Sequence, residues 1–232
     1  MRKILTIAAA LLVLSCGKTG FGTYWDTHSI DYSDIAAAED QFADFAEQAV
    51  AAPEKEALQA LDGLFDKLKK DEVAYYIYSD WMVGAFYNLL SPCRSPLLFS
   101  KAVERMVTDG VLTDSACEPF LRQRDWIQYN LAGAPAVVPG TALAGPTVVL
   151  VLDLGCPTCR RALEKLGADP RWEGLRHLAV GCGHGPTPTV EGWDYVVPQD
   201  ASVVFDPKMT PIFFVVGEDG TVEVPYTLAF SD

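Results

Sequence analysis

The segment Thr147–Leu166 reads TVVLVLDLGCPTCRRALEKL and joins an apolar run to a helical pattern through a Cys-x-x-Cys turn. Its first six residues are apolar or β-branched without alternation, which is typical of a strand covered on both faces. Gly155 allows the chain to turn, and Ala162 and Leu166 then recur at helical spacing. We therefore predict a buried strand followed by a helix that begins at Cys156.

The position of Cys156 at the start of a helix predicts a reactive thiol. The unpaired N–H groups and the dipole of a helix N-terminus favour an anion, and the thiolate is the reactive form of cysteine. Cys159 follows on the same helix face, within reach of the Cys156 sulfur as a resolving thiol. We expect Cys156 to titrate below an ordinary thiol, and the two residues are candidate catalytic residues.

The overall composition limits the size of the core and the choice of partners. The chain has 232 residues, 50% of them hydrophobic, which is enough for one large or two modest cores, and we favour two. Its formal net charge at pH 7 is −13. So acidic a protein is not expected to bind nucleic acid or an acidic surface.

The first fifteen residues are typical of an export signal. A basic start, Met1–Lys3, precedes an apolar core at 4–14 that is too short to span a bilayer as a helix. The four residues that overlap the end of this core, Val13-Leu14-Ser15-Cys16, resemble the lipobox of bacterial lipoproteins, in which the cysteine is lipidated. We expect a lipid anchor on Cys16 as the only membrane contact, on the periplasmic side of the outer membrane because residue 17 is not aspartate. The alternative is an ordinary signal with a fortuitous cysteine.

Composition and the positions of glycine and proline divide the remaining chain into four parts. We predict a tether at 16–32, an all-α domain at 33–132, a linker rich in Gly and Pro at 133–146, and an α/β domain at 147–232. Five helices are expected in the all-α domain. The fourth is expected over 96–108 and the fifth over 114–131. The third is expected over 71–90, where the candidates for a buried stripe are Val73, Ile77, Trp81 and Phe86.

Two cysteines of the helical domain, Cys93 and Cys117, are candidates for a disulfide if the protein is exported. If the helices run up and down, the helix between them separates the two residues by about 18 Å. A disulfide needs α-carbons within about 7 Å of each other, so a bridge requires a helix that folds back. Buried free thiols are the other interpretation, and both stay open.

Further strands are expected after the helix at the Cys-x-x-Cys turn. Leu175–Val180 is expected to be a strand, and 195–197 and 203–205 are expected to be short extended pieces. Thr210 and Pro211 then open a strand that continues to Val216. A turn at 217–220 leads into residues 221–224, which predicts a β-hairpin.

These motifs occur in the order found in the thioredoxin superfamily. The region from Gly133 to Val224 resembles the periplasmic thiol-disulfide oxidoreductase lipoproteins of the TlpA/ResA type, with a helical N-terminal domain of uncharacterised role. The resemblance implies an α/β thioredoxin-like domain, here truncated with little or no final helix. It also implies that Pro211 is cis and that Thr210 exposes its backbone to substrate peptides. The family's buried acid before the motif is missing, and Gly155 replaces the usual tryptophan.

The chemistry implied is disulfide exchange. The Cys156 thiolate attacks a substrate disulfide and Cys159 resolves the mixed disulfide, or the reaction runs backwards and oxidises the substrate. The expected partners are protein disulfides or dithiols. No part of the sequence names a cofactor, a redox partner or the direction of the reaction.

Two functions of other classes remain as alternatives. Cys156 and Cys159 together with Cys182 and His184 are four potential ligands of a metal site, although the spacing of the second pair is tighter than usual. Alternatively, the cysteine pair is a stable structural bridge, and the acidic helical domain of a non-catalytic envelope adaptor binds a partner.

Overall fold

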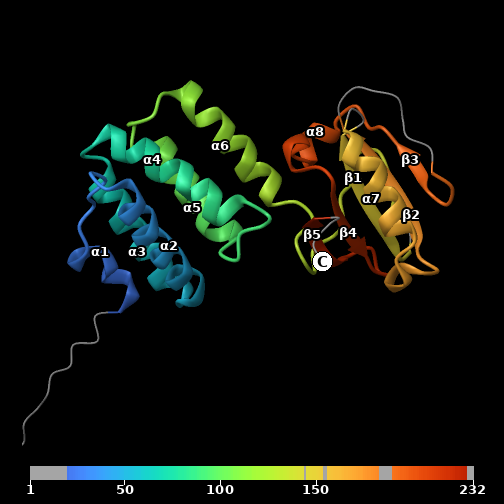
Figure 1. Ribbon diagram of the computed structural model, residues 1–232, viewed down its shortest axis with the longest axis horizontal. Helices are drawn as coiled ribbons and strands as arrows, with labels where there is room; N and C mark the ends of the chain where they lie inside the picture. Colours follow the sequence, from blue (N-terminus) through green and yellow to red (C-terminus); the bar gives the residue numbers. More distant parts are fainter. Residues whose placement is uncertain (1–19, 144, 154–155, 183–189, 229–232) are drawn as a thin grey trace, which may run out of the picture.

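The computed structural model describes residues 20–143, 145–153, 156–182 and 190–228. These residues form a helical region, at the left of Figure 1, and an α/β region at the right. None of the helices in these ranges combines the length and the apolar character that a membrane span requires. Each region has its own buried core, which agrees with the expected fold class of a helical part followed by an α/β part.

The helical region opens with two short helical turns, η1 (Phe21–Thr23) and α1 (Tyr24–Thr27). The longer elements, which account for the expected five helices, are α2 (Ile35–Ala51), α3 (Glu54–Leu68), α4 (Glu72–Met82) with the π-helical turn η2 (Val83–Tyr87), α5 (Pro96–Thr108) and α6 (Asp114–Ile127).

Side-chain caps mark the starts of α2, α4, α5 and α6, whereas α3 follows Pro53 without a side-chain cap. Asp34 accepts a hydrogen bond from Ala37 N–H, and Asp71 accepts from the N–H groups of Val73 and Ala74. At the start of α5, the Ser95 side chain accepts from Leu98 N–H, and at the start of α6, the Thr113 side chain accepts from Ala116 N–H. Such caps satisfy N–H groups that have no partner within the helix. The local sequence therefore determines where these four capped helices begin.

The expected buried stripe of the third helix is correct at Phe86, which is fully buried, but wrong at Val73. Ile77 and Trp81 are only partly buried and pack against the core. Val73 is 57% exposed, whereas Tyr75 and Tyr78 are fully buried. The large tyrosine rings bury more apolar area than Val73 does, and this sets the rotation of α4. The α-helix also ends at Met82, where the π-helical turn replaces the expected continuation to residue 90. Similarly, α6 ends at Ile127 rather than at residue 131.

The α/β region is built on one sheet with the strand order β3-β2-β1-β4-β5. Strands β1, β2 and β3 are parallel, β4 is antiparallel to β1, and β5 is antiparallel to β4. The elements are β1 (Thr147–Asp153), α7 (Pro157–Gly167), η3 (Pro170–Trp172), β2 (Arg176–Cys182), β3 (Asp194–Val196), α8 (Ala201–Val204), η4 (Pro207–Met209), β4 (Ile212–Val216) and β5 (Val222–Leu228).

The predicted strands and hairpin are present, but residues 203–205 are not an extended piece. Residues 201–204 form the short helix α8 instead. Ala201 and Val204 are both buried against the sheet, whereas Val203 is 57% exposed. Burial at i and i+3 matches helical spacing, so contact with the sheet favours a helical turn here.

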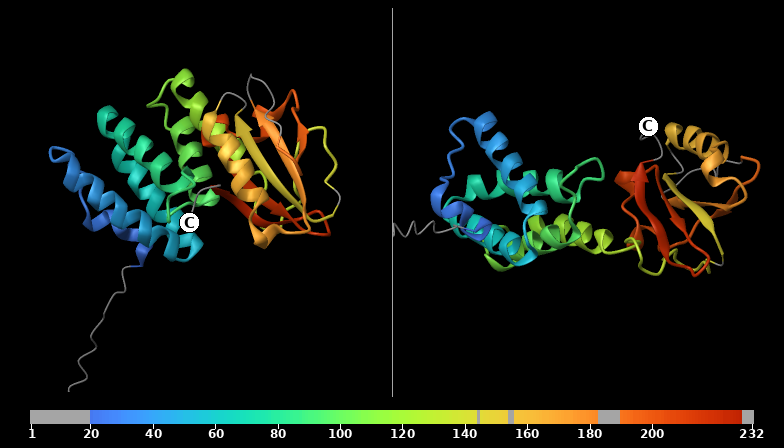
Figure 2. Two further views of the ribbon diagram at one scale, coloured as in Figure 1. Left: turned by 45° about the vertical axis from the view of Figure 1, so that its right-hand side comes forward. Right: turned by 90° about the horizontal axis from the view of Figure 1, so that it is seen from below.

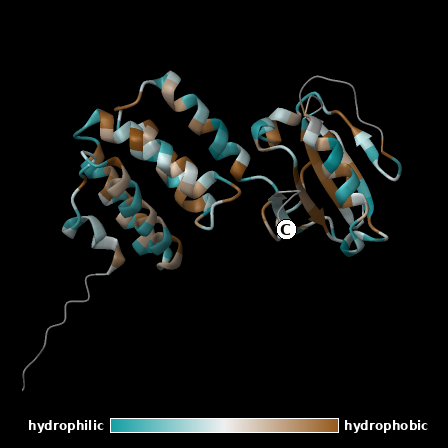
Figure 3. Ribbon diagram, viewed as in Figure 1, coloured by the Kyte–Doolittle hydropathy of each residue, from teal (hydrophilic) through white to brown (hydrophobic). Residues whose placement is uncertain are grey.

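The two faces of the sheet are covered differently. Helix α7 packs on one face, where its core includes Leu150, Leu152 and Leu163 (Figure 2). The other face is covered by α8 and by residues of 129–143, and Leu89 of the helical region also packs there. Residues 133–136 lie alongside the hairpin, since Gly133 N–H donates to Val222 O and Pro135 bridges Thr221. The central strand β1 is hydrophobic and buried from Val148 to Leu152, as a strand with two covered faces should be (Figure 3).

Candidate functional site

Cys156 and Cys159 lie at the start of α7, where the sequence predicted them. Cys156 is the N-cap residue of this helix and is partly exposed, while Cys159 is 1% exposed and packs against the side chains of β1. Both are free thiols. The helix start therefore presents one accessible sulfur and keeps a second one below the surface.

The surroundings shift the two thiols in opposite directions. The Thr158 hydroxyl lies 2.8 Å from the Cys156 sulfur. This hydrogen bond is the main cause of a lowered pKa of Cys156. Hydrogen bonds from the Cys159 thiol and from the N–H groups of Thr158 and Cys159 lower the pKa further, while partial burial raises it. Burial, and then the hydrogen bond to Cys156, raises the pKa of Cys159 to about 12. Of the two thiols, Cys156 is therefore the one that ionises more readily.

The sheet register brings Thr210 and Pro211 to the edge from which Cys156 extends. Ile212, at the start of β4, lies opposite Val151 near the end of β1. The two residues before Ile212 are therefore level with the end of β1, just before the Cys-x-x-Cys turn. Both are partly buried, and the peptide bond between them is cis. Their role in binding substrate stays a prediction.

The helical region contacts the segment that leads into Thr210, which sequence reasoning missed. The Tyr87 hydroxyl donates a 2.8 Å hydrogen bond to Asp206 Oδ2, in a buried position. Asp206 Oδ1 accepts from Lys208 N–H, and the Thr210 hydroxyl donates to Pro207 O. Burial, and then Asp206, raises the pKa of Tyr87. The contact joins residues 119 positions apart, so no local pattern indicates it.

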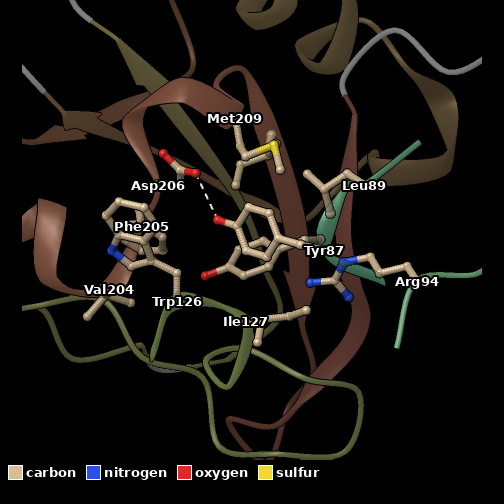
Figure 4. A pocket seen from close by; sticks show the side chains of 11 residues that line it. Tyr87, Leu89, Arg94, Trp126, Ile127, Val204, Phe205, Asp206 and Met209 are labelled. Atoms are coloured by element: carbon tan, nitrogen blue, oxygen red, sulfur yellow. Dashed lines mark hydrogen bonds between the residues drawn. The ribbon is translucent and has the colours of Figure 1, made fainter. Parts of the chain in front are cut away.

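Figure 4 shows the small cavity that surrounds this contact. It measures about 20 Å³, which is room for one water molecule. Met209 contributes to the apolar packing of both regions. The Nε atom of Arg94 is buried and has no hydrogen-bond partner among the residues that the structure describes. The segment before Pro211 is thus held between the two regions.

The four ligands of the alternative metal site do not gather in the described part of the chain. Cys182 pairs in register with Asp153 and belongs to the core on the sheet face that α7 does not cover. Cys159 belongs to the core under α7, so the sheet separates the two thiols. Within the described ranges no three His, Cys, Asp or Glu side chains are grouped as metal ligands would be. His184 lies outside those ranges, as does Cys16, the expected lipidation site.

The remaining cysteines are buried free thiols in the helical region. Cys93 and Cys117 are 6% and 4% exposed. The Cys117 thiol donates to Met106 O at 3.4 Å. Burial raises the pKa of both thiols. In this state they are poor nucleophiles.

Comparison with known proteins identifies one similar structure. No family model matches the chain, and no curated protein matches it. A crystal structure of a thioredoxin-like protein from Bacteroides caccae is similar over 99% of this chain and 96% of its own length, with a TM-score of 0.67 and 17% sequence identity. At this identity the likeness concerns the fold. The chain therefore has a thioredoxin-like α/β fold preceded by a helical region.

Proposed function

We propose that the chain is an exported thiol-disulfide oxidoreductase that uses Cys156 and Cys159. The observation that carries the proposal is the difference between the two thiols of one helical turn. Cys156 is partly exposed with a lowered pKa, and Cys159 is buried with a pKa raised to about 12. A dithiol with one accessible nucleophile and one protected resolving thiol suits stepwise disulfide exchange.

The first step joins the protein to its substrate. The Cys156 thiolate attacks one sulfur of the substrate disulfide, a new S–S bond forms, and the other substrate sulfur leaves as a thiolate. In the second step Cys159 gives up its proton to that leaving sulfur and attacks the Cys156 sulfur. The second substrate sulfur departs, the Cys156–Cys159 disulfide forms, and two electrons have passed to the substrate. The reverse sequence oxidises a substrate dithiol.

Thr210 and Pro211 are the proposed substrate-binding residues. The register of β1 and β4 supports this role, because it brings them level with the Cys-x-x-Cys turn. A substrate peptide bound there is held beside the Cys156 sulfur. Its backbone pairs with the main chain at residue 210, so the site accepts many peptide sequences. The proposed substrates are therefore protein disulfides or dithiols.

The proposed location is the periplasmic side of the outer membrane, with a lipid anchor on Cys16. The support is the leader sequence: a basic start, a short apolar core and the four residues that end at Cys16. Metabolic labelling with a radioactive fatty acid tests it. Label is expected in the parent chain and absent from Cys16→Ala, and equal labelling of both rules out this anchor.

Trapping of a mixed disulfide tests the oxidoreductase proposal. In Cys159→Ser the second step is blocked, so Cys156 is expected to remain bonded to substrate proteins as adducts that dithiothreitol releases. Cys156→Ser is the matched control and is expected to give none. If Cys159→Ser forms no more adducts than this control, the exchange mechanism is wrong. An adaptor with a structural cysteine bridge predicts that result and unchanged partner binding in Cys156→Ser.

A further inference from the structure

A groove of about 420 Å³ lies on the helical region, separate from the cysteine pair. Helix α2 forms one side, and the end of α4 with the π-helical turn η2 forms the other. The lining residues are Glu39, Phe42, Ala43, Ala46, Glu47, Asp80, Trp81, Gly84, Ala85, Ser91, Pro92 and Cys93. Its volume lies within the range of sites that bind ligands or side chains of a partner.

The floor of this groove is apolar and aromatic. Phe42 and Trp81 lie with ring centroids 5.9 Å apart, and Trp81 is only partly buried. The exposed Gly84 adds no side chain, so the π-helical turn leaves the groove open. Single-turn π-helices are rare and often occur at functional positions. An apolar side chain, or the stem of a lysine or arginine, fits against such a floor.

All the charged side chains that line the groove are negative: Glu39, Glu47 and Asp80 are exposed carboxylates. The sequence strengthens this polarity over both sides, since no Lys or Arg occurs at 19–54 or at 71–93. Glu47 also contributes, after burial, to the raised pKa of Cys93. An apolar groove with one sign of charge on its rim attracts a partner of the opposite sign.

We propose that this groove binds a basic segment of a partner protein, with Lys or Arg beside one or two large apolar side chains. The apolar side chains contact Phe42 and Trp81. The cationic groups face Glu39, Glu47 and Asp80. This binding is independent of disulfide exchange, because neither Cys156 nor Cys159 takes part in it.

Gly84 allows the groove to be filled without disturbing the core. A Cβ atom added there meets no other atom within 4 Å, and its φ angle is not in the left-handed region. Because Gly84 also lines the groove, Gly84→Trp is expected to narrow it with an indole. Val107→Trp, at an exposed position of α5, is the matched control for an added tryptophan. Glu39→Gln/Glu47→Gln/Asp80→Asn removes the charges, and Glu118→Gln is a charge control outside the groove.

The probe is a phage-displayed library of random dodecapeptides, selected on the full chain and depleted on Gly84→Trp. The selected peptides are expected to be rich in Lys or Arg and in large apolar residues. Their affinities, as synthetic peptides, are then measured by fluorescence anisotropy. The affinity for Gly84→Trp and for the triple variant should be lower than for the parent by about tenfold or more. The affinity for each of the two control variants should equal that for the parent.

Several results overturn the proposal. One is that depletion leaves no peptide that binds the parent. A second is that the selected peptides carry no excess of basic residues. A third is that the triple variant loses binding while Gly84→Trp retains it, which indicates general attraction to the acidic surface. Unchanged exchange activity in Gly84→Trp separates failure of this proposal from failure of the oxidoreductase proposal.

Discussion

Among the described residues, the helical region carries two cysteines and the α/β region carries three, and the two regions differ in how their surroundings treat the thiols. Cys93 and Cys117 are buried in a helical core, and burial raises the pKa of both thiols. Cys156 stands at the start of α7, is partly exposed and has a lowered pKa. The place of a cysteine in the fold, rather than the number of cysteines in the chain, therefore determines how readily its thiol ionises.

A second difference concerns the role of burial within one pair. Cys159 is as buried as the cysteines of the helical region, but the Cys156 sulfur lies next to it. Its raised pKa protects it from solvent reagents and leaves it available to a disulfide formed at Cys156. Burial accompanies a raised pKa in both regions, and only in α7 does the buried thiol have a partly exposed cysteine beside it, as the proposed exchange requires.

The largest expected effect is that of Cys156→Ser. We expect disulfide exchange with a fluorescent disulfide peptide to fall by about three orders of magnitude, because a serine hydroxyl does not replace a thiolate as nucleophile. Stopped-flow fluorescence measures it. If the variant keeps a tenth or more of the parent rate, another cysteine carries the reaction and Cys156 is not the nucleophile.

The contact between the two regions is expected to have a large effect on stability. Tyr87→Phe removes the donor to Asp206 Oδ2 and leaves that buried oxygen unpaired, so the free energy of unfolding should fall by about 1–3 kcal/mol. Urea denaturation measures the change. Tyr76→Phe, at an exposed position of α4, is the control and should be within about 0.5 kcal/mol of the parent. Equal stability of the two variants shows that the contact contributes nothing.

Thr158 is expected to have a moderate effect on the reactivity of Cys156. Thr158→Val removes the hydroxyl that is the largest cause of the lowered pKa, so the pKa of Cys156 rises and less thiolate is present at pH 7. Alkylation by iodoacetamide at this pH should slow by about three- to tenfold. Thr158→Ser keeps a hydroxyl and should react at nearly the parent rate. If Thr158→Val reacts as fast as Thr158→Ser, the Thr158 hydroxyl does not lower the pKa of Cys156.

The smallest effect is expected in the helical region. Cys93→Ala and Cys117→Ala should leave the exchange rate within about twofold of the parent, because neither thiol is accessible or ionised at neutral pH. The same stopped-flow assay measures it. A loss of tenfold or more in either variant gives these cysteines a part in the reaction.

The elements with strong local signals were predictable from the sequence. The strand, the Cys-x-x-Cys turn and the helix around Cys156 follow from apolar runs and helical spacing. The range of α5 agrees with its prediction, since Pro96 and the cap at Ser95 mark its start and Gly110 follows its end.

The features that were missed depend on tertiary contacts. The rotation of α4 is set by the burial of Tyr75 and Tyr78, and α8 forms because Ala201 and Val204 meet the sheet. The Tyr87–Asp206 hydrogen bond joins two regions that are far apart in the chain. The spacing of apolar residues indicates that a helix has a buried face. It does not show which of two neighbouring stripes of residues packs better against the adjoining elements.

The central claim is that Cys156 is reactive while the other described thiols are not. Alkylation of the reduced parent chain with iodoacetamide tests it directly. The reaction is followed as a function of pH, and mass spectrometry identifies the modified residues. We predict that Cys156 is modified first and that its rate rises with pH to a plateau. The midpoint should lie below that of an ordinary thiol, while Cys93, Cys117, Cys159 and Cys182 stay protected. A midpoint at or above the ordinary value, or equally fast modification of Cys93 or Cys117, contradicts the account.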